Sequence, residues 1–103
     1  MQRTSFVLMA AFAIVGCDKI DQQREALDTA DKRVKAGAYR DAIRSYESAL
    51  DGTAKTADVH YKIAVLYDDK LKEPLDAIHH YDRYLELSPS GGHAKEATAG
   101  RTD

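Results

Sequence analysis

The sequence predicts an all-α protein built from two copies of a helix-turn-helix unit. The segment from Asp41 to Leu50 repeats from Asp76 to Leu85, at an offset of 35 residues, with Asp, Ala, Ile, Tyr and Leu in the same order. The apolar residues within each segment recur at the spacing of a helix that buries one broad face. Glycines and prolines divide these helical stretches, so two helical hairpins stacked as a solenoid fragment are expected.

Each repeated segment follows another helical pattern. Leu27, Ala30 and Val34 form a sparse apolar stripe before the first segment, and residues 61–67 form a denser one before the second. Gly37 interrupts the first pair of helices, and residues 71–74 interrupt the second. Pro74 suits the first turn of a new helix, and residues 88–92 stop the last one. The two units are therefore predicted at 23–56 and 57–91.

The two units resemble tetratricopeptide repeats, helical hairpins with small and aromatic residues at set positions. In the first unit the matching residues are Ala30, Gly37, Tyr39, Ala42, Tyr46 and Ala49. In the second they are Ile63, Ala64, Tyr67, Ala77, Tyr81 and Pro89, with one residue inserted in the turn. The resemblance implies that these residues pack the repeats together and that the chain binds other proteins. Tyr84 departs from the pattern, because the family prefers Ala there.

Residues 1–16 have the character of a secretory signal. Arg3 precedes an unbroken apolar run from Phe6 to Val15, which is shorter than the ~20 residues that span a bilayer. Residues 14–17, Ile-Val-Gly-Cys, resemble the lipobox of bacterial lipoproteins. The resemblance implies cleavage after Gly16 and a covalent lipid on Cys17, followed by a short linker over residues 17–22. An ordinary signal peptide is the alternative.

Lipidation places the protein on a bacterial membrane, facing the periplasm, and the sequence does not decide between the inner and outer membranes. Several acyl chains on one residue hold a protein far more firmly than the single chain that binds only marginally. This covalent lipid is the only non-protein group expected, and no other cofactor is implied.

Composition and motifs argue against several other functions. A net charge of −2 gives no reason to expect a nucleic-acid partner. One cysteine excludes an internal disulfide and a cysteine-rich metal site. No phosphate-binding glycine loop and no nucleophile with a partnered base are recognisable, so an enzyme is not expected. The four histidines, His60, His79, His80 and His93, lack a metal-binding spacing and are expected on solvated helix faces.

The residues expected to contact a partner lie on the first helix of each unit, which lines the concave side of a tetratricopeptide array. Leu27, Tyr61 and Val65 would form an apolar strip, and Asp31 and Asp68 would lie on its rim. Tyrosine with a polar surround is typical of interface anchors. The alternative for Tyr61 is that it only covers the edge of the core. The basic residues with which some family members clamp a peptide carboxylate are absent here.

The last full helix carries more apolar residues than one neighbour can cover. They are Leu75, Ile78, Tyr81, Tyr84, Leu85 and Leu87. The short polar tail over 92–103, a second copy or a partner should cover the rest. The main hypothesis is a membrane-anchored protein-interaction module whose partners are membrane or envelope proteins. The alternative is a structural accessory subunit that completes a larger envelope assembly.

Overall fold

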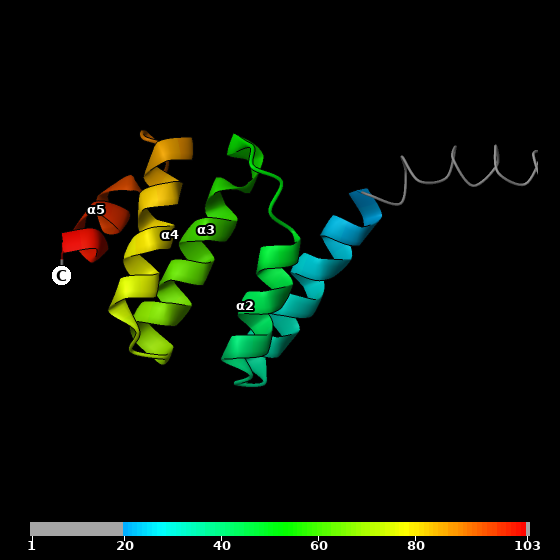
Figure 1. Ribbon diagram of the computed structural model, residues 1–103. Helices are drawn as coiled ribbons and strands as arrows, with labels where there is room; N and C mark the ends of the chain where they lie inside the picture. The colour runs from blue at the N-terminus through cyan, green and yellow to red at the C-terminus, as the bar shows by residue number, and fades with distance from the viewer. Residues whose placement is uncertain (1–19, 103) are drawn as a thin grey trace, which may run out of the picture.

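The computed structural model describes residues 20–102, and the regular structure in this range is entirely helical (Figure 1). The predicted all-α class is therefore confirmed. The helices are a first helix over 20–35, α2 (Tyr39–Ser48), α3 (Ala57–Val65), α4 (Pro74–Leu87) and α5 (Ala94–Thr102). A 3-10 turn, η1 (Ala54–Thr56), leads into α3, and a π-helical turn, η2 (Leu66–Lys70), ends it. Within residues 20–102, none of these helices is both long and apolar enough to span a bilayer.

The first hairpin consists of the helix over 20–35 and α2. Its turn depends on Gly37, whose φ of +79° is a left-handed conformation that glycine adopts without steric cost. The Arg33 guanidinium links the two helices, because its Nη1 donates a hydrogen bond of 2.6 Å to Ser45 Oγ. The first helix already includes residues 20–22, which the sequence analysis assigned to a linker.

The second hairpin consists of α3, η2 and α4. The residue inserted in this unit widens the last turn of the helix, because the Leu71 amide donates to the carbonyl of Leu66, five residues back, at 3.0 Å. Such π turns absorb a single extra residue without ending the helix. Lys72 then takes a φ of +55°, and Pro74 begins α4 as predicted.

Most of the residues that were predicted to pack the repeats are buried. They are Ala30, Ala42, Tyr46, Ala49, Ile63, Ala64, Ala77 and Tyr81. Tyr39 and Tyr67 are half-buried and lie against the core cluster that the first hairpin shares with α3 and η2. Gly37 and Pro89 are exposed, so the packing role predicted for these two is wrong. Gly37 acts through its backbone angle instead, and Pro89 lies in the turn that follows α4.

The tail after residue 91 forms the helix α5, a point that the sequence left open beyond a turn or two of helix. α5 packs along α4 and buries Ala97 completely. Gly100 lies against the ring of Tyr81, where any Cβ atom would overlap with it. Gly91 leaves space in the same way for the phenol of Tyr84, which is 0% exposed. The enlarged residue at position 84 therefore finds room because its neighbours are small.

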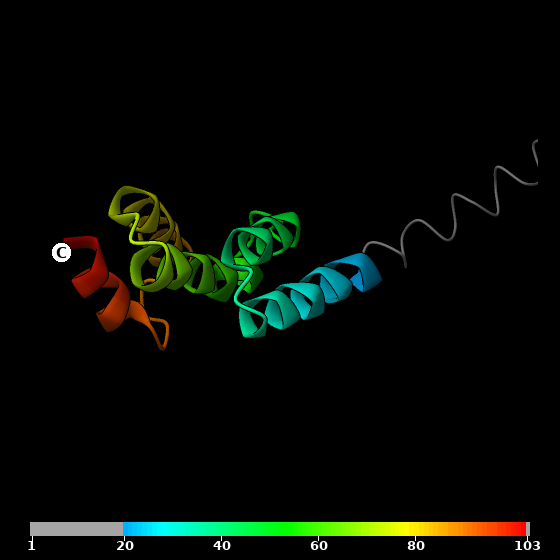
Figure 2. The same cartoon turned by 90° about the horizontal axis from the view of Figure 1, so that it is seen from below.

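The successive helices stand side by side in a row, with the first helix at one side and α5 at the other (Figures 1 and 2). The contacts of α4 with α3 and with α5 are much more extensive than the contact between α2 and α3. Of the wide apolar stripe on α4, α5 covers the part around Tyr81 and Tyr84. Leu75, at the start of α4, stays 82% exposed.

Candidate functional site

A shallow apolar groove of about 260 Å³ lies where the first helix, α2 and α3 meet. Its lining residues are Val34, Tyr46, Tyr61, Lys62, Val65 and Leu66. Tyr61 and Val65 belong to the predicted contact strip. The groove is positioned by the hairpin geometry, because the helical repeat places residues 61, 62 and 65 on one side of α3.

Tyr61 both lines the groove and belongs to an aromatic cluster. Its ring stacks on that of His93 at a centroid distance of 4.1 Å and an angle of 8°. The rings of Tyr84 and Tyr81 lie 5.6 and 6.0 Å away. Burial, followed by the charges of Glu96 and Asp69, raises the pKa of the Tyr61 phenol. The contact role and the core-edge role of Tyr61 are thus not exclusive.

Leu27, Asp31 and Asp68 lie outside the lining of the groove. Leu27 is half-buried and packs against the core of the first hairpin. Its spacing from Ala30 and Val34 is the ordinary spacing of a core stripe, so the sequence could not separate the two roles.

Asp31 and Asp68 each accept a hydrogen bond from a tyrosine on the second helix of their own hairpin. The Tyr46 hydroxyl donates to Asp31 Oδ1, and the Tyr81 hydroxyl donates to Asp68 Oδ2 at 3.3 Å. Burial and the hydrogen bond to Asp31 raise the pKa of Tyr46. Lys62 Nζ lies 3.9 Å from Asp31 Oδ1 and 5.6 Å from the centre of the Tyr46 ring. The rim of the groove therefore carries a cation and an anion that are already paired.

Sequence reasoning missed four of the lining residues, which are Val34, Tyr46, Lys62 and Leu66. Val34 was placed in the apolar stripe of the first helix. Tyr46 was assigned to repeat packing, and it does pack in the core while one part of it faces the groove. Lys62 follows Tyr61 directly, and its ammonium group lies near Asp31 and the Tyr46 ring, both of which come from other helices.

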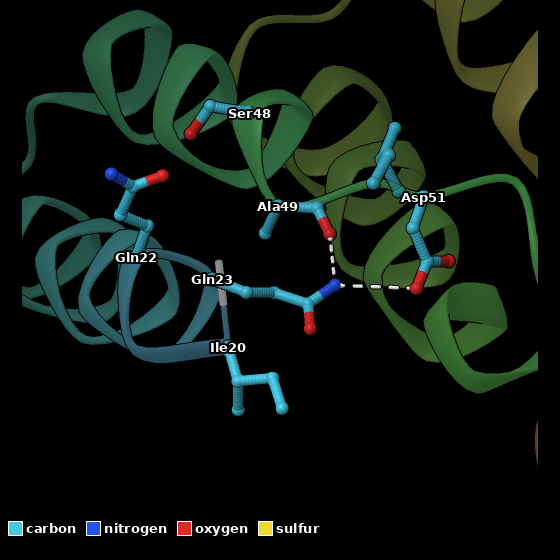
Figure 3. A pocket seen from close by; sticks show the side chains of 7 residues that line it. Ile20, Gln22, Gln23, Ser48, Ala49 and Asp51 are labelled. Carbon is cyan, nitrogen blue, oxygen red and sulfur yellow. Dashed lines mark hydrogen bonds between the residues drawn. The ribbon is translucent and has the colours of Figure 1, made fainter. Parts of the chain in front are cut away.

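A larger hollow of about 480 Å³ lies beside the first helix and the end of α2 (Figure 3). Its lining residues are Ile20, Gln22, Gln23, Ser48, Ala49, Leu50 and Asp51. Gln23 Nε2 reaches across it and donates to the Ala49 carbonyl at 2.7 Å and to Asp51 at 3.5 Å. Hydrogen bonds from Thr53, Thr56 and Gln23 lower the pKa of Asp51 to about 2. The hydrogen bonds of Gln23 cross this hollow, and its lining is not continuously apolar as that of the groove is.

The expectation that all four histidines are solvated is wrong for two of them. His60 and His80 are buried between α3 and α4, whereas His79 and His93 are exposed. Both buried rings lie on the helix faces that carry Ile63 and Ala77, and a histidine there can be a core residue if it finds a polar partner. In the described range, no three side chains of His, Cys, Asp or Glu converge so that they could hold a metal ion.

Comparisons of the chain with protein-family models, with characterised proteins and with solved structures gave no match. The function must therefore be argued from the residues of this chain. Cys17 lies outside the residues that the structure describes, so the lipid anchor is still a prediction.

Proposed function

We propose that this chain is a lipid-anchored tetratricopeptide-like module that binds other proteins at the periplasmic face of a bacterial membrane. The observation that carries the proposal is the apolar groove formed by Tyr61, Val65 and Val34 between neighbouring hairpins. Grooves of this kind receive an apolar side chain of a partner and surround it with polar contacts. The paired charges of Lys62 and Asp31 supply the polar rim.

The proposed anchor would keep the groove close to the membrane. Only two residues, Asp18 and Lys19, stand between Cys17 and Ile20 in the sequence. Three extended residue steps reach at most about 11 Å. Partners are therefore proposed to be membrane proteins or other envelope proteins, and a soluble partner that never approaches the membrane would not fit.

Site-specific photo-crosslinking in cells tests the groove. A photoreactive residue at Val65 should give discrete crosslinked products, whereas the same residue at exposed Leu75 on α4 should give few. Adding Tyr61→Ala to the Val65 probe should reduce its products about tenfold, since removing one anchor residue costs ~1–2 kcal/mol or more of binding. Equal products from positions 65 and 75 would contradict binding at the groove.

The anchor has its own test. Cys17→Ser should abolish lipidation and leave unprocessed precursor, as read by fatty-acid labelling and mass spectrometry of the mature N-terminus. An unmodified mature chain that begins elsewhere would refute the anchor and leave the groove proposal standing.

A structural accessory subunit is the second candidate, and exposed apolar residues are the observation that favours it. Ile20 and Leu75 are 62% and 82% exposed, and they lie on different helices. Single exposed apolar residues are normal on soluble proteins. If Leu75→Glu removed the chain from a membrane complex while Val65→Glu did not, the accessory role would replace the binding module.

A further inference from the structure

Two buried histidines face one another across the contact between α3 and α4. His60 and His80 are 6% and 7% exposed, and their Nδ1 atoms lie 3.0 Å apart. The ring centres are 5.2 Å apart, with an angle of 30° between the planes. This is a hydrogen bond between two imidazoles at the largest helix contact of the second hairpin.

The bond requires one definite distribution of protons. One Nδ1 must carry a hydrogen and the other must offer a lone pair, so the neutral pair consists of two different tautomers. In the part of the chain that the structure describes, every buried side-chain nitrogen or oxygen has a hydrogen-bond partner. A proton added to the accepting Nδ1 would remove the acceptor and set two N–H groups against each other.

The groups around the pair oppose a positive charge. On α4, the His79 ring meets the His80 ring edge-on at 4.9 Å. The positive charge of Arg83 opposes protonation of His60. From η2, the Tyr67 ring stacks on His80 at 5.9 Å. Glu86 alone favours the protonated form of His60.

The neighbouring elements contribute little charge to the pair. Glu47 of α2 acts on the Tyr67 phenol, and among the described residues neither α2 nor α5 supplies a charge that shifts the pKa of either histidine. Burial, assisted by His60 and His79, lowers the pKa of His80 to about 4. Burial, assisted by Arg83 and His79, also lowers the pKa of His60.

We propose that His60 and His80 form an acid-sensitive latch, closed when both rings are neutral, whose protonation separates α4 and α5 from α3. This inference goes beyond partner binding and does not depend on it. The latch lies in the second hairpin only, because the residue aligned with His80 in the first hairpin is Ser45, which accepts a hydrogen bond from Arg33. The first hairpin has no equivalent pair among its described residues.

The direction of the effect follows from proton binding. Both histidines have a lower pKa in the folded state than in the unfolded chain, where the ordinary value is 6.5. The unfolded state therefore binds more protons, and stability falls as the pH falls. The contribution of the pair is fully present above about pH 6.5 and is lost progressively toward pH 4.

Urea unfolding of the full chain at pH 7 and pH 5, followed by circular dichroism, tests the latch. The unfolding equilibrium constant should rise by about tenfold or more between these pH values. The double variant His60→Phe, His80→Phe removes both polar groups while it keeps two rings, and its constant should change much less. The control is His93→Gln, which removes an exposed histidine outside the pair and should keep the response of the native chain.

Long-range ¹H–¹⁵N spectra of the native chain give an independent measurement that does not require a variant to fold. His60 and His80 should show complementary neutral tautomers and titrate below 6.5, the ordinary pKa of histidine. Near-ultraviolet circular dichroism of the tyrosines should decrease as the pair titrates. Titration of the pair near pH 6.5, or an undiminished pH response in the double phenylalanine variant, would overturn the latch.

Discussion

The two hairpins differ in what covers their second helix. The first hairpin is followed by α3 of the next one, whereas the second is followed by the nine-residue α5. α5 presents small residues to α4, with Ala97 buried and Gly100 against Tyr81. The large side chain in this contact is that of Tyr84 on α4, which aligns with Ala49 of the first hairpin. A large residue on α4 and small residues on α5 thus fill the space between these two helices together.

The turns differ in a second way. Gly37 and Lys72 each lie two residues before the next helix, and both have a positive φ. Glycine adopts this conformation readily, while a residue with a Cβ pays roughly 1–2 kcal/mol for it. The second hairpin therefore contains local strain that the first lacks.

The largest predicted effect concerns Tyr84, the large residue that stands where the first hairpin has Ala49. Tyr84→Ala restores the residue of the first hairpin but leaves a cavity beneath α5, so the free energy of unfolding should fall by about 3–5 kcal/mol. Urea denaturation followed by circular dichroism measures it. Tyr39→Ala, at a half-buried site of the first hairpin, is the control and should have a smaller effect. A loss below about 1 kcal/mol for Tyr84→Ala would show that α4 and α5 repack freely.

The next effect concerns the cap. Gly100→Leu places a side chain where the Tyr81 ring lies, so α5 should leave α4 and stability should fall by about 1–3 kcal/mol. Gly92→Leu is the matched control, because a Cβ there meets nothing within 4 Å. Hydrogen exchange should show faster exchange of the α5 amides in the Gly100 variant only. Equal protection of α5 in both variants would mean that Gly100 does not set the contact.

The smallest effect concerns the turn. Lys72→Gly relieves the left-handed strain but gains chain entropy in the unfolded state, so a net stabilisation of about 0.5 kcal/mol is expected. Gly37→Ala in the first hairpin introduces the strain and should destabilise by about 1 kcal/mol. Thermal and urea unfolding compare the two. If both substitutions changed stability in the same direction, the two turns would not be equivalent.

The hairpins could be predicted because their information is local. The repeated segment with Ala42 and Ala77, the breaker at Gly37 and the Pro74 start signal each act within one turn of chain. The sequence left the helix after residue 91 undecided because its contacts use alanine and glycine, which leave no apolar stripe. Its Ala, Lys and Glu residues favour a helix, but only the tyrosines of α4 explain why it packs.

The groove was predicted in part. Tyr61 and Val65 were found from the helix that carries them, but Leu27 has the same pattern and packs in the core instead. Lys62 and the buried histidines depend on a partner from another helix, Asp31 for Lys62 and His80 for His60. Such pairs become visible only when the helices are placed together, so no single segment of sequence indicates them.

The position of α5 also determines how an array of this kind could grow. α5 occupies the face of α4 on which a further hairpin would stack, and Gly100 fits it closely to Tyr81. A hairpin added after residue 87 would have to displace it. The loop between Leu50 and Thr53 has no comparable cover, and the α2–α3 contact beside it is the smaller one. Lengthening by duplication would therefore be tolerated between the hairpins, with the terminal helix kept as a fixed end piece.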